Sequence, residues 1–210
     1  MELPIAATSF PQSASTAPST WLRRVTAFLV VRRVQISVVV FLLLIVEDLL
    51  VGIKPHDIAD WHDRHSVLGL TLVLTGLGVR SWAAGTLLKR FQLTTTGLYQ
   101  LIRNPLYVGS FIMMLGFCQL IDDPENVFFV LGPFLLIYLL KVRDEERILS
   151  KSFGMQWQAY AKATPRFFPR RLAGNPFAGW TLSRWKANRE YKSFGSALAG
   201  LIALKLWYLA

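Results

Sequence analysis

The chain has 210 residues, 53% of them hydrophobic, and a net charge of +10. The apolar residues gather in blocks about as long as the roughly 20-residue helix that crosses a bilayer, and the mean hydropathy is +0.38. The basic residues lie between these blocks, which favours anionic lipid headgroups as partners and argues against a nucleic acid. The single cysteine, Cys118, excludes a disulfide framework and is expected to be a buried thiol.

The N-terminal part of the chain predicts a tail followed by one membrane helix. Residues 1–20 are rich in Ser, Thr, Ala and Pro and have no basic segment followed by an apolar one, so we expect a flexible tail and not a signal peptide. Residues 34–53 form the first apolar block and are preceded by arginines. Residues 21–65 are therefore expected to hold the first transmembrane helix and an outer loop.

The middle of the chain predicts three more membrane helices. The second covers residues 66–88 and the third covers residues 105–121, with Pro105 in the first turn, where its missing N–H costs nothing. The sequence Asp-Asp-Pro-Glu-Asn then predicts a tight turn before a fourth helix over residues 127–142. Because few residues join the third and fourth helices, we expect them to form an antiparallel hairpin.

The C-terminal residues 173–210 are expected to be a basic segment followed by a last transmembrane helix. Residues 194–210 could span the bilayer, with Trp207 and Tyr208 at the far interface, or could lie among the headgroups; we expect the span. The predicted fold class is an all-α integral membrane protein of about five transmembrane helices. Its core is assigned to residues 66–172.

Charge predicts how these helices are oriented. Basic segments precede the first helix, follow the second and follow the fourth, whereas the turn after the third helix is acidic. Because basic loops stay in the cytoplasm, the N-terminus, residues 89–104 and residues 141–192 are expected to be cytoplasmic. The chain is therefore predicted to be a multi-pass integral membrane protein, in an inner or cytoplasm-facing membrane, with its active site on the cytoplasmic side.

One loop contains three histidines, which could indicate a metal site. His56, His62 and His65 lie between the first and second predicted helices. The charge pattern places this loop on the face opposite the other polar features of the chain. We therefore expect solvent-exposed histidines that bind no catalytic metal.

Within the second predicted helix, two glycines precede a charged residue. Gly76 and Gly78 would allow a neighbouring helix to approach closely, and a Gly-x-Gly pair alone is weak evidence for a nucleotide site, so helix packing is the preferred interpretation. A charge inside a span faces a cavity or extends to the interface, and both remain open for Arg80.

Two further features meet at the predicted cytoplasmic boundary. Arg103, Asn104 and Tyr107 surround the first turn of the third helix, whose free N–H groups can hold an anionic group, although an ordinary interfacial belt has the same composition. The three acids at 144–146 could form a solvated face or direct one carboxylate to a cationic ligand or a ribose hydroxyl. With Arg80, these features predict a cleft at the cytoplasmic helix ends that suits a zwitterion with a planar base.

Two motifs resemble known signatures. The sequence TTGLYQLIRNPLYVG resembles the Gly-x-Tyr-x-x-x-Arg-His-Pro-x-Tyr-x-Gly signature of the isoprenylcysteine carboxyl methyltransferase and phospholipid methyltransferase superfamily. Residues 145–169 resemble its second signature, which has a Glu pair, Phe-Gly, a Tyr and a final Pro, and GLGVRSWAAGTL resembles the span before the first. The resemblance covers about residues 70–170 in the expected order. It implies an integral membrane methyltransferase that binds S-adenosylmethionine at the cytoplasmic helix ends.

The resemblance also implies which residues form the site. The expected cofactor-binding residues are Phe91, Gln92, Leu93, Thr94, Tyr99, Asn104, Pro105, Leu106, Tyr107 and Glu145. Arg103, Asn104 and Glu145 are the expected catalytic residues. Lys141 is the expected substrate contact, and Arg143 could substitute for it. Adjacent helical residues point about 100° apart, so Glu145 is expected in the cleft and Glu146 in solvent.

The chain departs from the signature at Asn104, where the best-studied members have histidine, although relatives with Arg-Asn-Pro also belong to the superfamily. Asparagine donates and accepts hydrogen bonds but is not protonated near neutral pH, so a role in cofactor positioning survives and an acid–base role does not. Methyl transfer from a sulfonium needs alignment and exclusion of water and no metal. The lack of a site histidine favours an acceptor that is already deprotonated, although Glu145 or Tyr99 could accept the proton of an amine.

The expected function is methyl transfer from S-adenosylmethionine to a lipophilic acceptor that enters from the bilayer. A prenyl-type carboxylate or thiol is the first choice of acceptor, and the alternative is a phospholipid amine. From another class, the chain could be a non-catalytic membrane protein that binds a lipid or a partner. Neither a nucleic acid nor a metal is expected as a partner.

Overall fold

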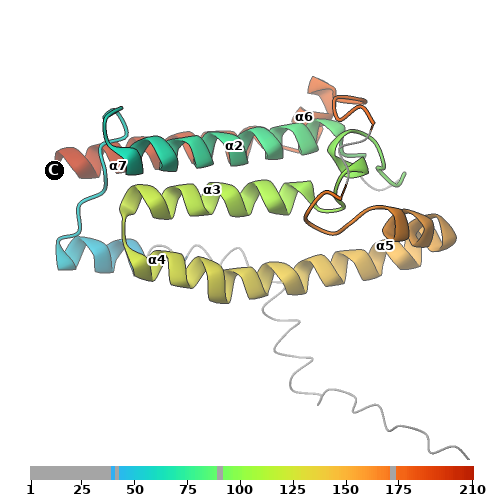
Figure 1. Ribbon diagram of the computed structural model, residues 1–210, viewed down its shortest axis with the longest axis horizontal. Coiled ribbons are helices and arrows are strands. Elements are labelled where there is room, and N and C mark those ends of the chain that lie inside the picture. The colour runs from blue at the N-terminus through green and yellow to red at the C-terminus, as the bar shows by residue number, and fades with distance from the viewer. Residues whose placement is uncertain (1–38, 41–42, 89–91, 171–173) are drawn as a thin grey trace, which may run out of the picture.

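The described chain consists of helices and the loops that join them. The computed structural model describes residues 39–40, 43–88, 92–170 and 174–210, and no strand occurs among them. The elements are α2 (Arg64–Thr86), η1 (Gly97–Gln100), α3 (Pro105–Ile121), α4 (Pro124–Phe129), η2 (Val130–Phe134), α5 (Leu135–Ala163), α6 (Leu182–Ala187) and α7 (Glu190–Leu209). Figure 1 shows the long helices lying side by side. The all-α class expected from the sequence is confirmed.

The first predicted span is described only in part. Residues 43–51 are helical, and the helix ends at Gly52, whose φ of 81° few other residues adopt. The predicted tail, residues 1–20, lies outside the described residues. The buried Asp48 accepts a hydrogen bond of 3.0 Å from the Asn126 amide, so this first helix is joined to the start of α4.

The second and third predicted helices agree with the structure. α2 begins after Asp63, whose carboxylate accepts from the backbone N–H groups of His65 and Ser66, a typical N-cap. α3 begins at Pro105, as expected, and ends at Ile121. Local signals of this kind define helix ends without help from distant contacts, which explains the agreement.

Glycines bring α2 and α3 together. A Cβ atom at Gly76 would lie 2.5 Å from the carbonyl oxygen of Gly109, and one at Gly116 would lie 2.6 Å from the backbone nitrogen of Val73. These separations are too short for any side chain, so the backbones touch, and the packing interpretation of Gly76 is confirmed. Gly78 has nothing within 4 Å of its Cβ position.

The fourth predicted helix differs from expectation. The turn after α3 contains only Asp122 and Asp123, because Asp123 caps α4 and Pro124 occupies its first turn. The prediction that Pro-Glu-Asn belongs to the turn is therefore wrong. The helix then continues to Ala163 through the π-helical turn η2, well beyond the predicted end at residue 142.

α5 contains a kink at Gly154. This residue has φ 49° and ψ −120°, a conformation that glycine adopts without the steric cost that a Cβ brings. The chain turns there, as the right side of Figure 1 shows. As a result, residues 155–170 return towards the loop before α3.

α7 lies along α2 and is joined to it at both ends. Arg80 of α2 pairs with Glu190 at the start of α7 at 2.9 Å. At the other end, Lys205 pairs with Asp57, in the loop before α2, at 2.6 Å. The buried cluster of Val73, Leu120, Ile121 and Leu204 lies among α2, α3 and α7 near this second contact.

Two helices are long and apolar enough to cross a membrane by length and composition: α2 and the continuous helix Pro124–Ala163. α3 is also apolar but has 17 residues. That α3 and the following helix form a pair of membrane spans, and that the chain has five spans in all, stays a prediction.

The polar loops separate into two groups. In Figure 1 the loop at 52–63 and the turn between α3 and α4 lie at one end of the long helices, while residues 92–104 and 164–170 lie at the other. The histidine loop therefore lies at the end opposite the predicted cleft. We call the first group the histidine end and the second the signature end.

Candidate functional site

A buried carboxylate occupies the centre of the signature end. Glu146 is 8% exposed, and its Oε2 lies 2.6 Å from Nη2 of Arg166. Its Oε1 lies 3.3 Å from Nη1 of Arg103 and accepts a hydrogen bond of 3.3 Å from the Asn104 amide. Hydrogen bonding to Glu146 raises the pKa of Arg166. Glu146 of α5 thus connects the residues just before α3 with the segment that follows α5.

The expectation that Glu146 lies in solvent is wrong. The kink at Gly154 returns the chain, and the carbonyl of Pro165 accepts a hydrogen bond of 2.9 Å from the backbone N–H of Arg103. This contact holds Arg166 over a face of α5 that would otherwise be open to water. Burying a carboxylate requires such partners, because an unpaired charge is strongly disfavoured away from water.

Glu145 lies beside Glu146 in sequence but has other partners. The Tyr107 hydroxyl donates to its Oε1 at 2.8 Å, and Nζ of Lys141 lies 3.4 Å from the same oxygen. Its side chain is 39% exposed. Lys141, the expected substrate contact, is therefore next to the expected catalytic carboxylate, whereas Arg143 is exposed. The contact between Tyr107 and Glu145 connects the two signatures directly.

Aromatic residues cover the loop before α3. The Tyr160 hydroxyl donates to the backbone carbonyl of Tyr99 at 2.7 Å, and the Arg103 guanidinium lies 5.8 Å from the centre of the Trp157 ring. Burial raises the pKa of Tyr99 well above its ordinary value. Its phenol therefore stays protonated at neutral pH, which argues against Tyr99 as the group that accepts a proton from an amine.

The other predicted cofactor residues that the structure describes lie in the loop after α2 or in the first turn of α3. Thr94 is buried and its hydroxyl accepts a hydrogen bond of 2.8 Å from the backbone N–H of Leu88. Gln92 is exposed and Leu93 is half-buried, while Phe91 lies outside the described residues. Pro105 is buried and Leu106 half-buried.

Arg80 faces inward and not towards the interface. Its guanidinium donates to both carboxylate oxygens of Glu190, at 2.9 and 3.1 Å, to the Ser193 hydroxyl at 2.8 Å and to the Ser110 hydroxyl. Sequence reasoning missed Glu190, although an acid at the start of an apolar helix is an available signal. The pairing also explains how a charge is accommodated inside an apolar helix.

Two buried donors at the signature end suit a polar ligand. Among the described residues, none accepts a hydrogen bond from the Tyr99 hydroxyl or from Nε of Arg103. S-adenosylmethionine offers a carboxylate, ribose hydroxyls and adenine nitrogens as acceptors, and its positive groups suit Glu145. The residues present therefore fit this cofactor.

The histidine loop differs in part from expectation. The His62 side chain is fully exposed, as predicted, and that of His65 is half exposed. His56 is only 24% exposed, because it lies between the carboxylates of Asp63 and Asp122. The expectation of solvent exposure is therefore wrong for His56.

Comparison with known proteins gives a family and three relatives. Residues 65–156 match the family model described as phospholipid methyltransferase. The chain is 29% identical over 145 residues to the nickel-cobalt-cadmium resistance protein NccN of Alcaligenes xylosoxydans xylosoxydans, covering 68% of this chain and 61% of that protein. It is 32% identical over 118 residues to the cobalt-zinc-cadmium resistance protein CzcN of Cupriavidus metallidurans, with coverages of 55% and 53%.

The third relative is an enzyme by its name. The chain is 26% identical over 130 residues to protein-S-isoprenylcysteine O-methyltransferase B of Arabidopsis thaliana, covering 56% of this chain and 63% of that protein. The chain thus spans between about half and two-thirds of the length of these relatives. No solved structure matches the chain.

Proposed function

Residues 65–156 belong to the phospholipid methyltransferase superfamily, and on this premise we propose that the chain transfers a methyl group from S-adenosylmethionine to a lipophilic acceptor. The observation that carries the proposal is the hydrogen bond of 2.8 Å between Tyr107 and Glu145. It joins one residue of each signature across 38 positions of the chain. Two separate motifs that converge in space support a shared ligand more strongly than either motif alone.

The residues of the signature end have distinct proposed roles. Glu145 accepts a hydrogen bond or a positive charge from the cofactor, and Tyr107 orients its carboxylate. Asn104 is fixed by Glu146 at 3.3 Å and positions the first turn of α3. Arg103 and Tyr99 supply the buried donors, and Trp157 and Tyr160 keep water from them. The cofactor supplies an electrophilic methyl group on sulfur, so the protein's task is alignment and exclusion of water.

The proposed acceptor is a prenyl-type carboxylate or thiol. Lys141 places a positive charge beside Glu145, which would attract an anionic acceptor. The likeness to an isoprenylcysteine methyltransferase supports the same choice. A phospholipid amine is the alternative acceptor, and it requires a base; with the Tyr99 phenol held protonated, Glu145 is the candidate for that role. We further propose that the signature end faces the cytoplasm.

Ligand binding and turnover test this proposal in two stages. Titration of the purified protein with S-adenosylhomocysteine should show saturable binding, and S-adenosylmethionine with a labelled methyl group should then label a prenylcysteine analogue. Label transferred to phosphatidylethanolamine instead would establish the alternative acceptor. Absence of binding to S-adenosylhomocysteine would contradict both and favour the non-catalytic lipid-binding class.

A second candidate function is a part in resistance to transition-metal cations. Two relatives bear such names, and the histidine end of this chain brings together His56, His65 and Asp122. Methyl transfer and this role do not exclude each other, because the two groups of residues lie at opposite ends of the long helices.

A further inference from the structure

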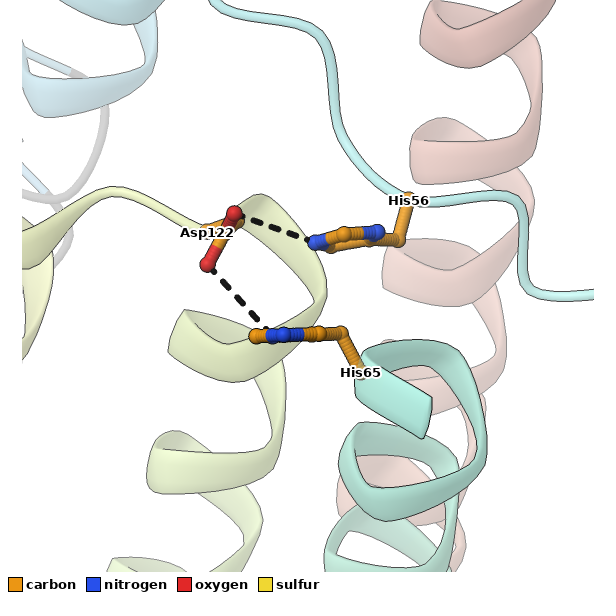
Figure 2. A group of neighbouring side chains, drawn as sticks. All are labelled: His56, His65 and Asp122. Atoms are coloured by element: carbon orange, nitrogen blue, oxygen red, sulfur yellow. Dashed lines mark ion pairs between the residues drawn. The ribbon is translucent and has the colours of Figure 1, made fainter. Parts of the chain in front are cut away.

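Three potential metal ligands converge at the histidine end. His56, His65 and Asp122 each offer one ligand atom, and these atoms lie within 4.8 Å of one another. Nε2 of His56 lies 3.2 Å from one Asp122 oxygen, and Nδ1 of His65 lies 3.6 Å from the other. Figure 2 shows both rings beside the same carboxylate, and the rings stack with their centres 4.8 Å apart.

These distances are close to those of a metal site. Bonds of about 2.0–2.1 Å in a tetrahedral site place neighbouring ligand atoms roughly 3.3 Å apart. The separations of 3.2 and 3.6 Å are close to this value, but they join the two histidines to different oxygens of Asp122. With one ligand atom from each residue, any pair lies at most 4.8 Å apart and would close by at most about 1.5 Å. Small movements of the half-exposed His65 and Asp122 side chains suffice for that closure.

The orientation of His56 is fixed by a second carboxylate. Its Nδ1 lies 2.7 Å from Oδ2 of Asp63, so Nδ1–H donates there and Nε2 faces Asp122. Yet Nε2 is buried and has no aligned hydrogen-bond partner among the described residues. In the neutral ring, the lone pair of Nε2 thus faces a carboxylate, an arrangement that a cation between the two would stabilise. A carboxylate that holds the remote nitrogen is common behind metal-binding histidines.

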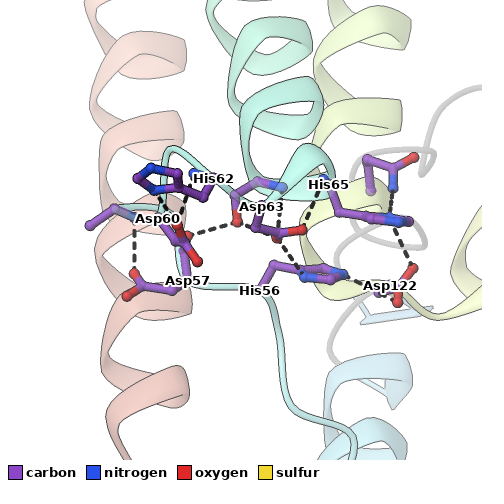
Figure 3. Close-up of polar contacts among 10 residues, drawn as sticks. His56, Asp57, Asp60, His62, Asp63, His65 and Asp122 are labelled. Carbon is purple, nitrogen blue, oxygen red and sulfur yellow. Dashed lines mark hydrogen bonds and ion pairs between the residues drawn. The ribbon is translucent and has the colours of Figure 1, made fainter.

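The three ligands come from three elements: the loop before α2, the start of α2 and the end of α3 (Figure 3). The backbone N–H of His56 donates to the carbonyl of Leu120 at 2.8 Å, so the loop is attached to α3. The Ser66 hydroxyl donates to Asp63 at 2.8 Å, and the backbone N–H groups of His65 and Ser66 donate to the same carboxylate. These bonds hold the Asp63 carboxylate in place behind His56.

Asp122 is placed by the end of α3. It adopts a left-handed conformation with φ 61°, and its N–H donates to the carbonyl of Cys118. Its side chain is half exposed, as is that of His65, so a cation can enter from solvent. The Gln119 amide nitrogen lies 2.6 Å from Nδ1 of His65. When a cation binds Nδ1, this amide would move aside or turn its oxygen towards the cation.

We propose that His56, His65 and Asp122 bind a divalent transition-metal cation, with Asp63 orienting His56 from behind. Two imidazole nitrogens and one carboxylate suit Zn²⁺, Co²⁺ or Ni²⁺, whereas Mg²⁺ and Ca²⁺ prefer oxygen ligands. Three protein ligands leave one position open to water. The site lies at the end opposite Glu145 and is independent of methyl transfer.

Titration of the full chain with Zn²⁺ tests the proposal. The protein is prepared without a polyhistidine tag, treated with a chelator and titrated in the presence of excess Mg²⁺. We expect a single equivalent of Zn²⁺ to bind. Co²⁺ should give visible absorption bands that Zn²⁺ removes, a result that needs no variant.

Variants then assign the ligands. His56→Ala, His65→Ala and Asp122→Asn should each weaken binding by more than tenfold, and Asp63→Asn by roughly ten- to a hundredfold, the range for residues behind a ligand. Asn also serves as an N-cap, so Asp63→Asn should leave α2 intact. His62→Ala is the matched control, because His62 is in the same loop but fully exposed. Thermal unfolding without metal should be similar for all variants.

Three outcomes would overturn the proposal. Zn²⁺ binding that survives the double change His56→Ala/His65→Ala would place the metal elsewhere. An equal loss in His62→Ala would indicate nonspecific binding to surface histidines. Absence of Zn²⁺ and Co²⁺ binding would show that the contact between His56 and Asp122 is a side-chain contact only.

Discussion

Glu145 and Glu146 are neighbours on α5, yet their carboxylates lie in different surroundings. Glu146 is buried against Arg103 and Arg166, and Glu145 is partly exposed beside Tyr107 and Lys141. A buried carboxylate between two guanidinium groups is saturated with donors and holds the segments together. The carboxylate that water reaches retains acceptor capacity for a ligand. Glu146 therefore has a structural role, and Glu145 is the carboxylate to which we assign the proposed binding role.

This division predicts different effects of two equivalent substitutions. Glu145→Gln should weaken binding of S-adenosylhomocysteine roughly tenfold, the low end for a charge-assisted hydrogen bond of about 1.5–3 kcal/mol, because solvent screens the carboxylate. Glu146→Gln should lower the free energy of unfolding by about 1.5–3 kcal/mol, because both guanidinium groups lose their counter-charge. Calorimetric titration and thermal unfolding of both variants measure the two effects.

The comparison of the two variants is its own control, since each changes one carboxylate on the same helix. Lost affinity in a well-folded Glu146→Gln, with Glu145→Gln unchanged, would assign the ligand to the buried carboxylate. Unchanged stability in Glu146→Gln would contradict the structural role.

The contacts that the sequence did not predict are made between segments far apart in the chain. A turn elsewhere in the chain brings these segments together. The Asn104 side chain lies at the signature end, where the predicted cleft was expected, but its partner Glu146 was expected in solvent. The burial of Glu146 depends on Arg166, which arrives only because the chain turns at Gly154. No local pattern around Glu146 contains that information.

At the scale of elements, helix ends set by local sequence signals were predicted well, whereas an end set by contacts with distant residues was missed. The start of α3 was predicted at Pro105, and α2 within two residues, because caps and a proline act locally. The end of α5 was missed, because its last turns are not apolar and are held by Trp157 and Tyr160 packing on the loop before α3. A hydropathy pattern predicts where the apolar part of a helix ends. It does not predict where the helix itself ends.

The contact of α2 with α3 predicts opposite outcomes for two glycines of one helix. Gly76→Ala places a Cβ 2.5 Å from the backbone of α3, so the helices must separate and stability should fall by about 1–3 kcal/mol, the usual cost of overpacking. Gly78→Ala meets nothing within 4 Å and should be neutral or stabilising by up to about 1 kcal/mol, because alanine favours helix. Thermal unfolding in detergent measures both.

Here Gly78→Ala is the matched control for helix propensity. Equal stability of the two variants would mean that α2 and α3 are not in backbone contact. A loss in Gly78→Ala alone would point to a ligand or lipid on that face of α2.

At the scale of the molecule, the two groups of polar residues lie at opposite ends of helices that include two of membrane-spanning length. The signature end contains Arg103 and Arg166, and the histidine end contains Asp63, Asp122 and Asp123. Basic loops stay in the cytoplasm. In the proposed orientation, the carboxylates of Asp63 and Asp122 would lie on the outer side, where an external cation could reach them.

Cysteine labelling tests this orientation. In a chain with Cys118→Ser, we expect a membrane-impermeant maleimide to label Glu125→Cys in intact cells and Thr95→Cys only after permeabilisation. Both positions are exposed and lie at opposite ends of the molecule. Asp123 is a poorer position, because it is buried and caps α4. Equal labelling of both variants in detergent is the control for reactivity. If Thr95→Cys were labelled from outside and Glu125→Cys were not, the signature end would face outward, and a cytoplasmic supply of S-adenosylmethionine could not reach it.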